Sequence, residues 1–161
     1  MTMNSRMTTA LLSGLAGAAA LNLLHETMRR VRPEDAPRMD TLGRRAIASG
    51  MEAAGVDPPP EDRLQAMALG GDVVSNTLYY SLAAMGKPSF ARGAALGAAA
   101  GVGAVVLSPL LRLGSRPAAR TPQTAAMTVA WYLVGGLAAA AAHHGLAHAQ
   151  GLDTESIPAT A

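Results

Sequence analysis

The chain has 161 residues, about the size of one domain, and 50% of them are hydrophobic although only one tryptophan, three tyrosines and one phenylalanine are present. Its 13 basic and 11 acidic side chains give a net charge of +2, which is too weak and too scattered for a nucleic-acid-binding protein. The absence of cysteine excludes disulfides, zinc–thiolate sites, iron–sulfur clusters and cysteine nucleophiles.

Four stretches approach the roughly 20 mostly apolar residues that a helix needs to cross a bilayer core about 30 Å thick. In chain order they cover about residues 8–28, 64–85, 91–111 and 124–147. The second is the least apolar because Asp72 lies well inside it, and a central carboxylate costs about 2.5–3.5 kcal/mol on insertion scales. The pattern predicts an all-α, integral membrane four-helix bundle, with three spans as the alternative.

The whole chain, 1–161, is expected to be one membrane domain. A soluble bundle would need a polar stripe on every helix, yet residues 93–107 contain no polar side chain. Arg6, the apolar run after it and the alanines at 18–20 imitate a cleaved signal peptide. Cleavage would leave segment 29–63 outside the cytoplasm, which the distribution of basic residues argues against.

The first apolar stretch carries Asn22, His25 and Glu26 near its end. Asn22 and Glu26 are four residues apart and therefore lie on one face of a helix. Placing an ionisable group at membrane depth costs free energy, so such a group indicates a functional site by default. A structural alternative exists for Glu26, which lies close enough to the end of the helix to reach the membrane surface beside Arg29 and Arg30.

A short amphipathic helix is predicted at about residues 38–55, between the first and second spans. Its polar face would present Arg44 and Arg45 to lipid phosphates, with the apolar face in the headgroup boundary. Alternatively, the apolar face covers the cytoplasmic end of the bundle, or docks a partner. Gly55 is suited to end this helix, and the three prolines that follow at 58–60 form a stiff extended turn.

The second stretch places Asp72 and Asn76 on one helix face. Because the first span ends and the second begins on the same side, these residues are expected at the depth of Glu26 and its neighbours. One hypothesis is a proton or cation site formed by Asp72 and Glu26, with Asn22, His25 and Asn76 as neutral ligands or relays. Oxygen donors suit a proton or a hard cation. The other hypothesis is a structural polar network around Asp72.

Two ridges of small residues recur every four positions along a helix face. Gly93, Gly97 and Gly101 form a double GxxxG pattern on the third span, and Ala10, Gly14 and Ala18 form a similar ridge on the first. Such ridges let helix backbones approach closely in lipid. They predict packing inside one bundle, with dimerisation or docking on a larger membrane complex as the alternative.

The fourth span is predicted to begin with Thr121 as its N-cap and carries His143, His144 and His148 near its other end. The spacing of His144 and His148 is that of two ligands on one helix face. We nevertheless expect the three histidines to face water at the membrane surface. The tail at 151–161 is polar and expected to be loose.

The basic residues predict the orientation. Seven arginines lie at or in the first loop and three in the third, whereas only Arg6, Lys87 and Arg92 belong to the opposite side. Because cytoplasmic loops carry the excess of lysine and arginine, the first and third loops are placed in the cytoplasm and both termini outside a bacterial inner membrane.

No G-x-S-x-G, H-E-x-x-H or phosphate-binding loop pattern occurs in the sequence. The chain is therefore expected to be no enzyme, with no cofactor and no metal. The leading functional hypothesis is a non-catalytic accessory subunit or scaffold that packs with a second copy or a larger membrane complex. The alternative is a small transporter or channel that uses Asp72 and Glu26.

Overall fold

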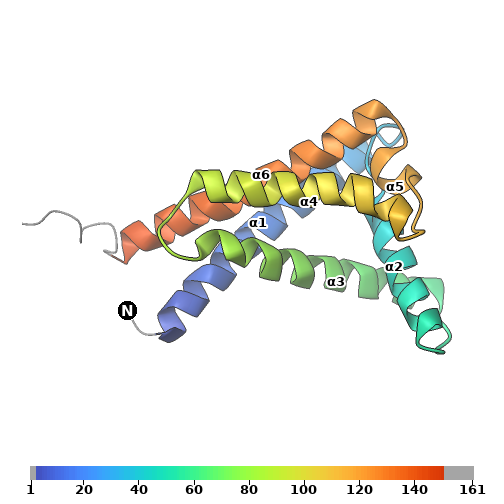
Figure 1. Cartoon of the computed structure of the whole chain (residues 1–161), viewed down its shortest axis with the longest axis horizontal. Coiled ribbons are helices and arrows are strands. Elements are labelled where there is room, and N and C mark those ends of the chain that lie inside the picture. Colours follow the sequence, from blue (N-terminus) through green and yellow to red (C-terminus); the bar gives the residue numbers. More distant parts are fainter. Residues whose placement is uncertain (1–2, 151–161) are drawn as a thin grey trace, which may run out of the picture.

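The computed structural model describes residues 3–150, and over that range the chain is helical with no strand. The elements in chain order are α1 (Met3–Val31), α2 (Met39–Ala53), α3 (Glu61–Ser81), the 3-10 turn η1 (Leu82–Ala84), α4 (Phe90–Leu110), α5 (Arg116–Ala119) and α6 (Pro122–Ala149) (Figure 1). The all-helical prediction is confirmed. The short α5 was not predicted, and the tail 151–161 lies outside the described residues.

Local signals end and start the helices as the sequence predicts. Gly55 follows the end of α2 with φ at +74°, a left-handed conformation that glycine adopts without steric cost. The Thr121 hydroxyl accepts a hydrogen bond from the backbone N–H of Thr124 at 3.0 Å and caps α6. Ser89 caps α4 in the same way by accepting from the Arg92 N–H.

The long helices alternate in direction. The side chain of Thr9, near the start of α1, contacts Gln150, just after the end of α6. Gly93 at the start of α4 lies against Gly136, and Gly101 further along α4 lies against Val129 nearer the start of α6. Both α1 and α4 are therefore antiparallel to α6, and so parallel to each other.

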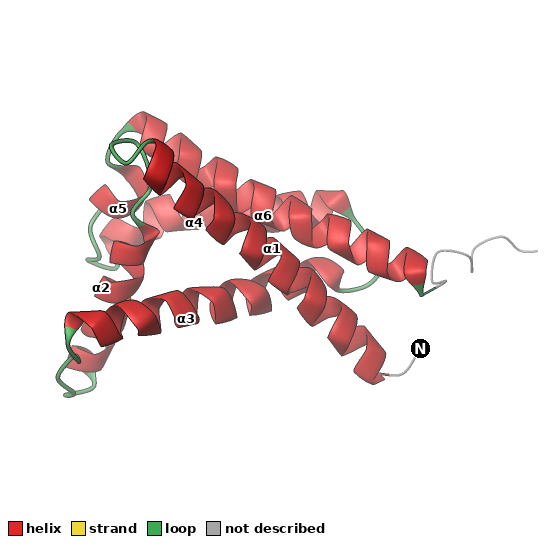
Figure 2. Ribbon diagram, turned by 180° about the vertical axis from the view of Figure 1, so that it is seen from behind, coloured by secondary structure: helices red, strands yellow, loops and turns green. Residues whose placement is uncertain are grey.

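Since α1 and α4 run in the same direction, the chain between them must return from one end of the molecule to the other. The segment that returns is α3, which is antiparallel to α1: Gly14 near the start of α1 lies against Thr77 and Ser81 at the end of α3. Figures 1 and 2 show α3 running between the two ends of the molecule. Its 21 residues correspond to about 31 Å, close to the thickness of a bilayer core.

The helices α2 and α5 lie together at the end where α1 and α4 finish (Figure 1). The Arg38 N–H donates to the carbonyl of Pro117 at 2.7 Å, and the Arg45 guanidinium donates to the carbonyl of Leu113 at 2.8 Å. The first and third loops, which hold most of the arginines, therefore meet at one end. At the other end, Arg92 donates to the carbonyls of Met85 and Lys87 in the α3–α4 loop.

Three of the described helices are long and apolar enough to cross a membrane: α1, α4 and α6. Three of the four predicted stretches therefore form helices that could span a membrane, and the second stretch does not have the required hydropathy. Although α3 has 21 residues, its charged first turn and its polar residues, among them Asp72 and Asn76, keep its hydropathy below that of the other three.

The buried core is small and aromatic at its centre. Tyr80 from α3 is fully buried and packs with Leu21, Ala83, Tyr132 and Ala139. Its hydroxyl donates to the backbone carbonyl of Tyr132 at 2.8 Å and so links α3 to α6. Large apolar side chains cover the outside instead, with the Leu110 side chain 71% exposed. So much exposed apolar surface is unusual for a monomer in water and typical of a surface that meets lipid or a partner.

Candidate functional site: polar cavities beside Asp72

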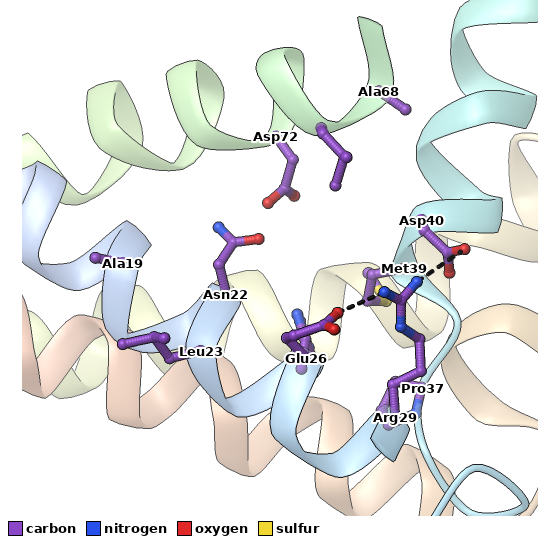
Figure 3. Close-up of a pocket in the computed structure, with 12 residues that line it drawn as sticks. Ala19, Asn22, Leu23, Glu26, Arg29, Pro37, Met39, Asp40, Ala68 and Asp72 are labelled. Carbon is purple, nitrogen blue, oxygen red and sulfur yellow. Dashed lines mark hydrogen bonds and ion pairs between the residues drawn. The ribbon is translucent and has the colours of Figure 1, made fainter. Parts of the chain in front are cut away.

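A cavity of about 490 Å³ lies between α1, α2 and α3 (Figure 3). Four of the five residues predicted as a proton or cation site line it: Asn22, His25, Glu26 and Asp72. The antiparallel pairing of α1 and α3 brings them together, because the end of α1 meets the first half of α3. We refer to this space as the polar cavity.

Asp72 is half-buried, and its surroundings on α3 and α1 are neutral. Its carboxylate accepts a hydrogen bond from the Asn76 side-chain amide, one turn further along α3, at 2.9 Å. The Asn22 amide of α1 points toward the same carboxylate (Figure 3). No ion pair among the described residues includes Asp72. The fifth predicted residue, Asn76, therefore belongs to the site through Asp72 although it does not line the polar cavity.

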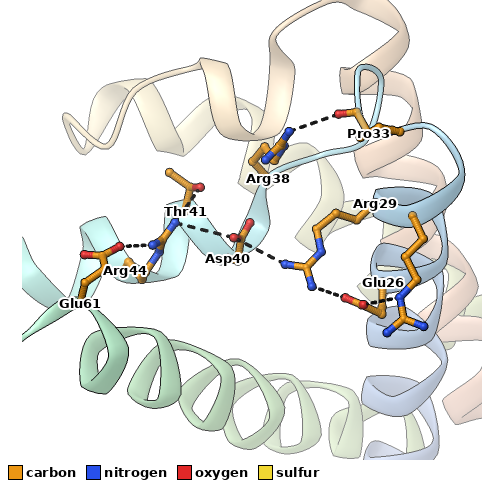
Figure 4. A network of polar contacts seen from close by, with 9 residues as sticks. Glu26, Arg29, Pro33, Arg38, Asp40, Thr41, Arg44 and Glu61 are labelled. Carbon is orange, nitrogen blue, oxygen red and sulfur yellow. Dashed lines mark hydrogen bonds and ion pairs between the residues drawn. The ribbon is translucent and has the colours of Figure 1, made fainter.

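Glu26 is neutralised, in contrast to Asp72. Its carboxylate forms ion pairs with Arg29 at 2.5 Å and with Arg30 at 2.7 Å, and the side chain is 39% exposed. The same Arg29 also approaches Asp40 of α2 at 3.8 Å (Figure 4). Glu26 thus has the surroundings expected of the structural alternative, with both neighbouring arginines as partners.

The imidazole of His25 lies edge-on to the ring of Tyr132, with centroids 6.0 Å apart. Its Nε2 is buried and has no hydrogen-bond partner among residues 3–150. A buried polar atom without a partner is unusual in a native structure and is consistent with a bound water or ligand. The ring therefore supplies one unused polar group to the lining of the polar cavity.

A second cavity, also about 490 Å³, lies between α2, α3, α4 and α6. It forms because α3 lies against α1 and stands apart from α4 and α6 over most of its length (Figure 2). Its lining is dominated by small and apolar side chains from α4 and α2, and Asp72 is its one charged residue. We call it the apolar cavity. Asp72 and Met39 line both cavities, so the two spaces adjoin at the carboxylate.

The glycine ridge of α4 faces α6. Gly93, Gly97 and Gly101 are all buried. A Cβ on Gly97 would lie 2.5 Å from the carbonyl oxygen of Tyr132 and 2.7 Å from the Cα of Leu133. The contact between the two helices is therefore made by backbone atoms, and no larger residue fits there without a shift of α6.

The small residues of α1 are divided between two neighbours. Gly14 faces α3, where a Cβ would lie 2.8 Å from the Ser81 N, and Ala18 is fully buried. Ala10 is partly buried. A further close contact, which the spacing of small residues does not predict, is made by Gly17, where a Cβ would lie 2.6 Å from the carbonyl oxygen of Gly135.

The two arginines predicted to meet lipid phosphates make protein contacts. Arg44 forms an ion pair with Glu61 of α3 and lies 3.7 Å from Asp40 (Figure 4). Arg45 donates to the Leu113 carbonyl. These contacts attach α2 across the end of the bundle, as in the capping alternative. Contact with lipid phosphate stays a prediction.

The three histidines near the end of α6 have different surroundings. His143 is only 5% exposed, so the expectation that all three face water is wrong for this residue, which lies on the buried face of α6. The ring of His144 stacks on Phe90 of α4, with centroids 4.6 Å apart and an interplanar angle of 13°. Among residues 3–150, no group of three or more histidine or acidic side chains, these histidines included, is arranged to hold a metal.

Comparison with protein-family models, with curated proteins and with solved structures finds no match to this chain.

Proposed function

We propose that this chain is an integral membrane protein with four crossings, its arginine-rich end in the cytoplasm and both termini outside a bacterial inner membrane. The parallel direction of α1 and α4 is the observation that supports it most strongly. If both cross a membrane, the connection between them has to cross as well, and α3 has the length to do so. Ten arginines at one end against three basic residues at the other give the orientation.

Because the chain has no cysteine, single cysteines test this topology without a background signal. We would introduce Ser49→Cys in α2, Ser115→Cys before α5 and Lys87→Cys in the α3–α4 loop, all at exposed positions. A membrane-impermeant maleimide should label Lys87→Cys from outside intact cells and the other two only after lysis. If α3 does not cross, Ser49→Cys and Ser115→Cys will lie on opposite sides, which would refute the four-crossing proposal.

The surroundings of Asp72 favour a transporter or channel, which we call the conduit, over a scaffold. An isolated carboxylate between two cavities is available to a proton or cation, whereas a structural carboxylate is expected in a closed interface with its charge compensated. We therefore propose that the protein is not an enzyme and that it binds or conducts a proton or small cation at Asp72, with Asn22 and Asn76 as neutral ligands. Glu26 is left out of this site because two arginines already compensate it.

The test is flux into vesicles that contain the purified protein. Asp72→Asn keeps the shape and the hydrogen bond to Asn76 but removes the charge, so it should abolish cation-dependent flux while the helical circular dichroism spectrum stays unchanged. Asp62→Asn is the matched control, because Asp62 is an exposed carboxylate in the first turn of the same helix. Equal flux in the wild type and Asp72→Asn would rule out the conduit.

An accessory subunit or scaffold remains the second candidate. It is favoured by the large exposed apolar side chains on α3, where Val74 is 59% and Leu78 55% exposed. These side chains meet either lipid or another protein. Gentle solubilisation of native membranes followed by identification of co-purifying proteins would test it: a stoichiometric partner supports the scaffold, and a homogeneous monomer contradicts it.

A further inference from the structure

The two cavities beside Asp72 have complementary character. The polar cavity contains the carboxylates of Asp72, Glu26 and Asp40 and the unpartnered His25 Nε2. The apolar cavity is lined largely by alanine, glycine, leucine and methionine, and Asp72 is its single charge. A ligand whose charge lies at Asp72 would therefore have polar surroundings on one side and an apolar space on the other.

The charges around the polar cavity leave one negative charge without a partner. Glu26 is paired with Arg29 and Arg30, and Asp40 lies 3.8 Å from Arg29 and 3.7 Å from Arg44. Asp72 has only amide neighbours. Even a half-buried carboxylate without a cation is costly, and a single positive charge on a ligand would compensate it.

A divalent metal ion fits this lining poorly. Ca²⁺ takes six to eight oxygen ligands and Mg²⁺ requires near-ideal octahedral coordination, whereas the groups beside the Asp72 carboxylate are the side-chain amides of Asn22 and Asn76, and the Asn76 amide donates its N–H to it. No group of three or more acidic or histidine residues among those described is arranged for a metal. Each cavity is also much larger than an ion requires, since about 490 Å³ falls in the range of small-molecule sites, about 300–1,000 Å³.

We propose that the ligand is an organic monovalent cation with an apolar part, whose ammonium or related group binds Asp72 and whose apolar part occupies the apolar cavity. Tyr79 and Tyr132 line that cavity, and aromatic faces attract cations. The Tyr79 hydroxyl donates to the Leu96 carbonyl at 2.9 Å and bridges α3 and α4 beside the cavity. This inference rests on the proposed function, since it names the ligand class of the same site.

Calorimetric titration of the full chain in phosphatidylcholine nanodiscs tests the inference with two probes. Hexyltrimethylammonium carries the charge and an apolar chain, and tetramethylammonium carries the charge alone. The wild type should bind the hexyl probe on the order of tenfold more tightly or better, because several buried methylene groups contribute to its affinity. Equal affinity for both probes, or no binding of either, would overturn the inference.

Two variants separate the contributions of charge and cavity. Asp72→Asn should weaken binding of both probes by about tenfold or more, whereas Asp62→Asn should leave it unchanged. Gly103→Leu adds a side chain to the lining of the apolar cavity at a position where a Cβ has no contact closer than 3.8 Å. It should weaken the hexyl probe selectively. If Asp72→Asn binds both probes as tightly as the wild type and Gly103→Leu binds the hexyl probe as tightly as the wild type, the proposed arrangement is overturned. If a variant fails to fold, the difference in wild-type affinity between the two probes still tests it.

The outcomes also distinguish this inference from the proposed function. Flux of protons that depends on Asp72, with no binding of the hexyl probe, would overturn the organic-cation inference and leave the conduit standing. Binding of the hexyl probe that depends on Asp72, with no flux of any cation, would overturn the conduit and support the ligand site.

Discussion

The α4–α6 interface and the space between α3 and α4 show how the same small residues lead to opposite packing. In the interface, glycines of α4 lie directly against α6: Gly93 lies against Gly136 and Ala140, and Gly97 lies against the backbone of Tyr132 and Leu133. On α3, Gly70 and Gly71 have no atom of another helix within 4 Å of where a Cβ would be. Close contact thus arises where the glycine face of a helix is directed at the backbone of a neighbouring helix, and glycine by itself does not produce it.

On the side of α3 that faces the bundle, larger polar residues take the place of glycine. Asp72 and Tyr79 line the apolar cavity between α3 and α4. The two helices stand apart over most of their length (Figure 2). The packed interface is suited to holding the fold together, and the open side is suited to a ligand. Three pairs of substitutions, ordered by expected effect, test this contrast.

The largest effect is expected at the packed interface. Gly97→Ala places a methyl group against the backbone of Tyr132 and Leu133, and should lower the free energy of unfolding by about 2–3 kcal/mol. The matched control is Gly70→Ala on α3, which has free space and should be neutral or stabilising by up to about 1 kcal/mol, because alanine favours a helix over glycine. Unfolding in mixed micelles with increasing detergent denaturant measures both. Equal effects would mean that the α4–α6 contact is looser than described.

An intermediate effect is expected where α3 is attached to the core. Tyr80→Phe removes a fully buried hydroxyl that donates to the Tyr132 carbonyl, and should cost about 1 kcal/mol. Tyr79→Phe removes the similar bond to Leu96 at a partly exposed position and should cost less, about 0.5 kcal/mol. The same unfolding assay compares them. A larger loss for Tyr79→Phe would indicate that α3 is held mainly against α4, contrary to the open side described above.

Much of the fold was predictable because it depends on local patterns. Apolar stretches, the Thr121 cap and Gly55 fixed the positions of the helices to within a few residues. The coming together of Asn22, Glu26 and Asp72 followed from the alternation of helix directions. The four-residue spacing of Gly93, Gly97 and Gly101 predicted a packing ridge on α4, but the sequence did not indicate that α6 would be the helix packed against it.

The rest depends on tertiary packing that spacing does not encode. Gly17 does not belong to the repeat of small residues on α1, so its contact with Gly135 is not visible in the sequence. The central position of Tyr80 depends on where along α6 the end of α3 makes contact, which the sequence does not specify. The apolar cavity exists only because α3 diverges from α4. Asp40 was missed as a cavity residue because the fold of the loop after α1 brings α2 beside Arg29.

The smallest effect is expected at the polar attachment of α2 to α3, which lies outside both the packed interface and the cavities (Figure 4). Glu61→Gln removes the ion pair with Arg44, but the Glu61 side chain is 72% exposed, so the pair contributes only about 0.3 kcal/mol. Asp62→Asn is the control, because both carboxylates lie in the first turn of α3 and lose the same interaction with the helix dipole. The difference between the two variants isolates the ion pair and should vanish at about 1 M salt, where the Debye length is about 3 Å. A salt-independent difference above about 1 kcal/mol would show instead that α2 is anchored as firmly as α4 and α6 are to each other.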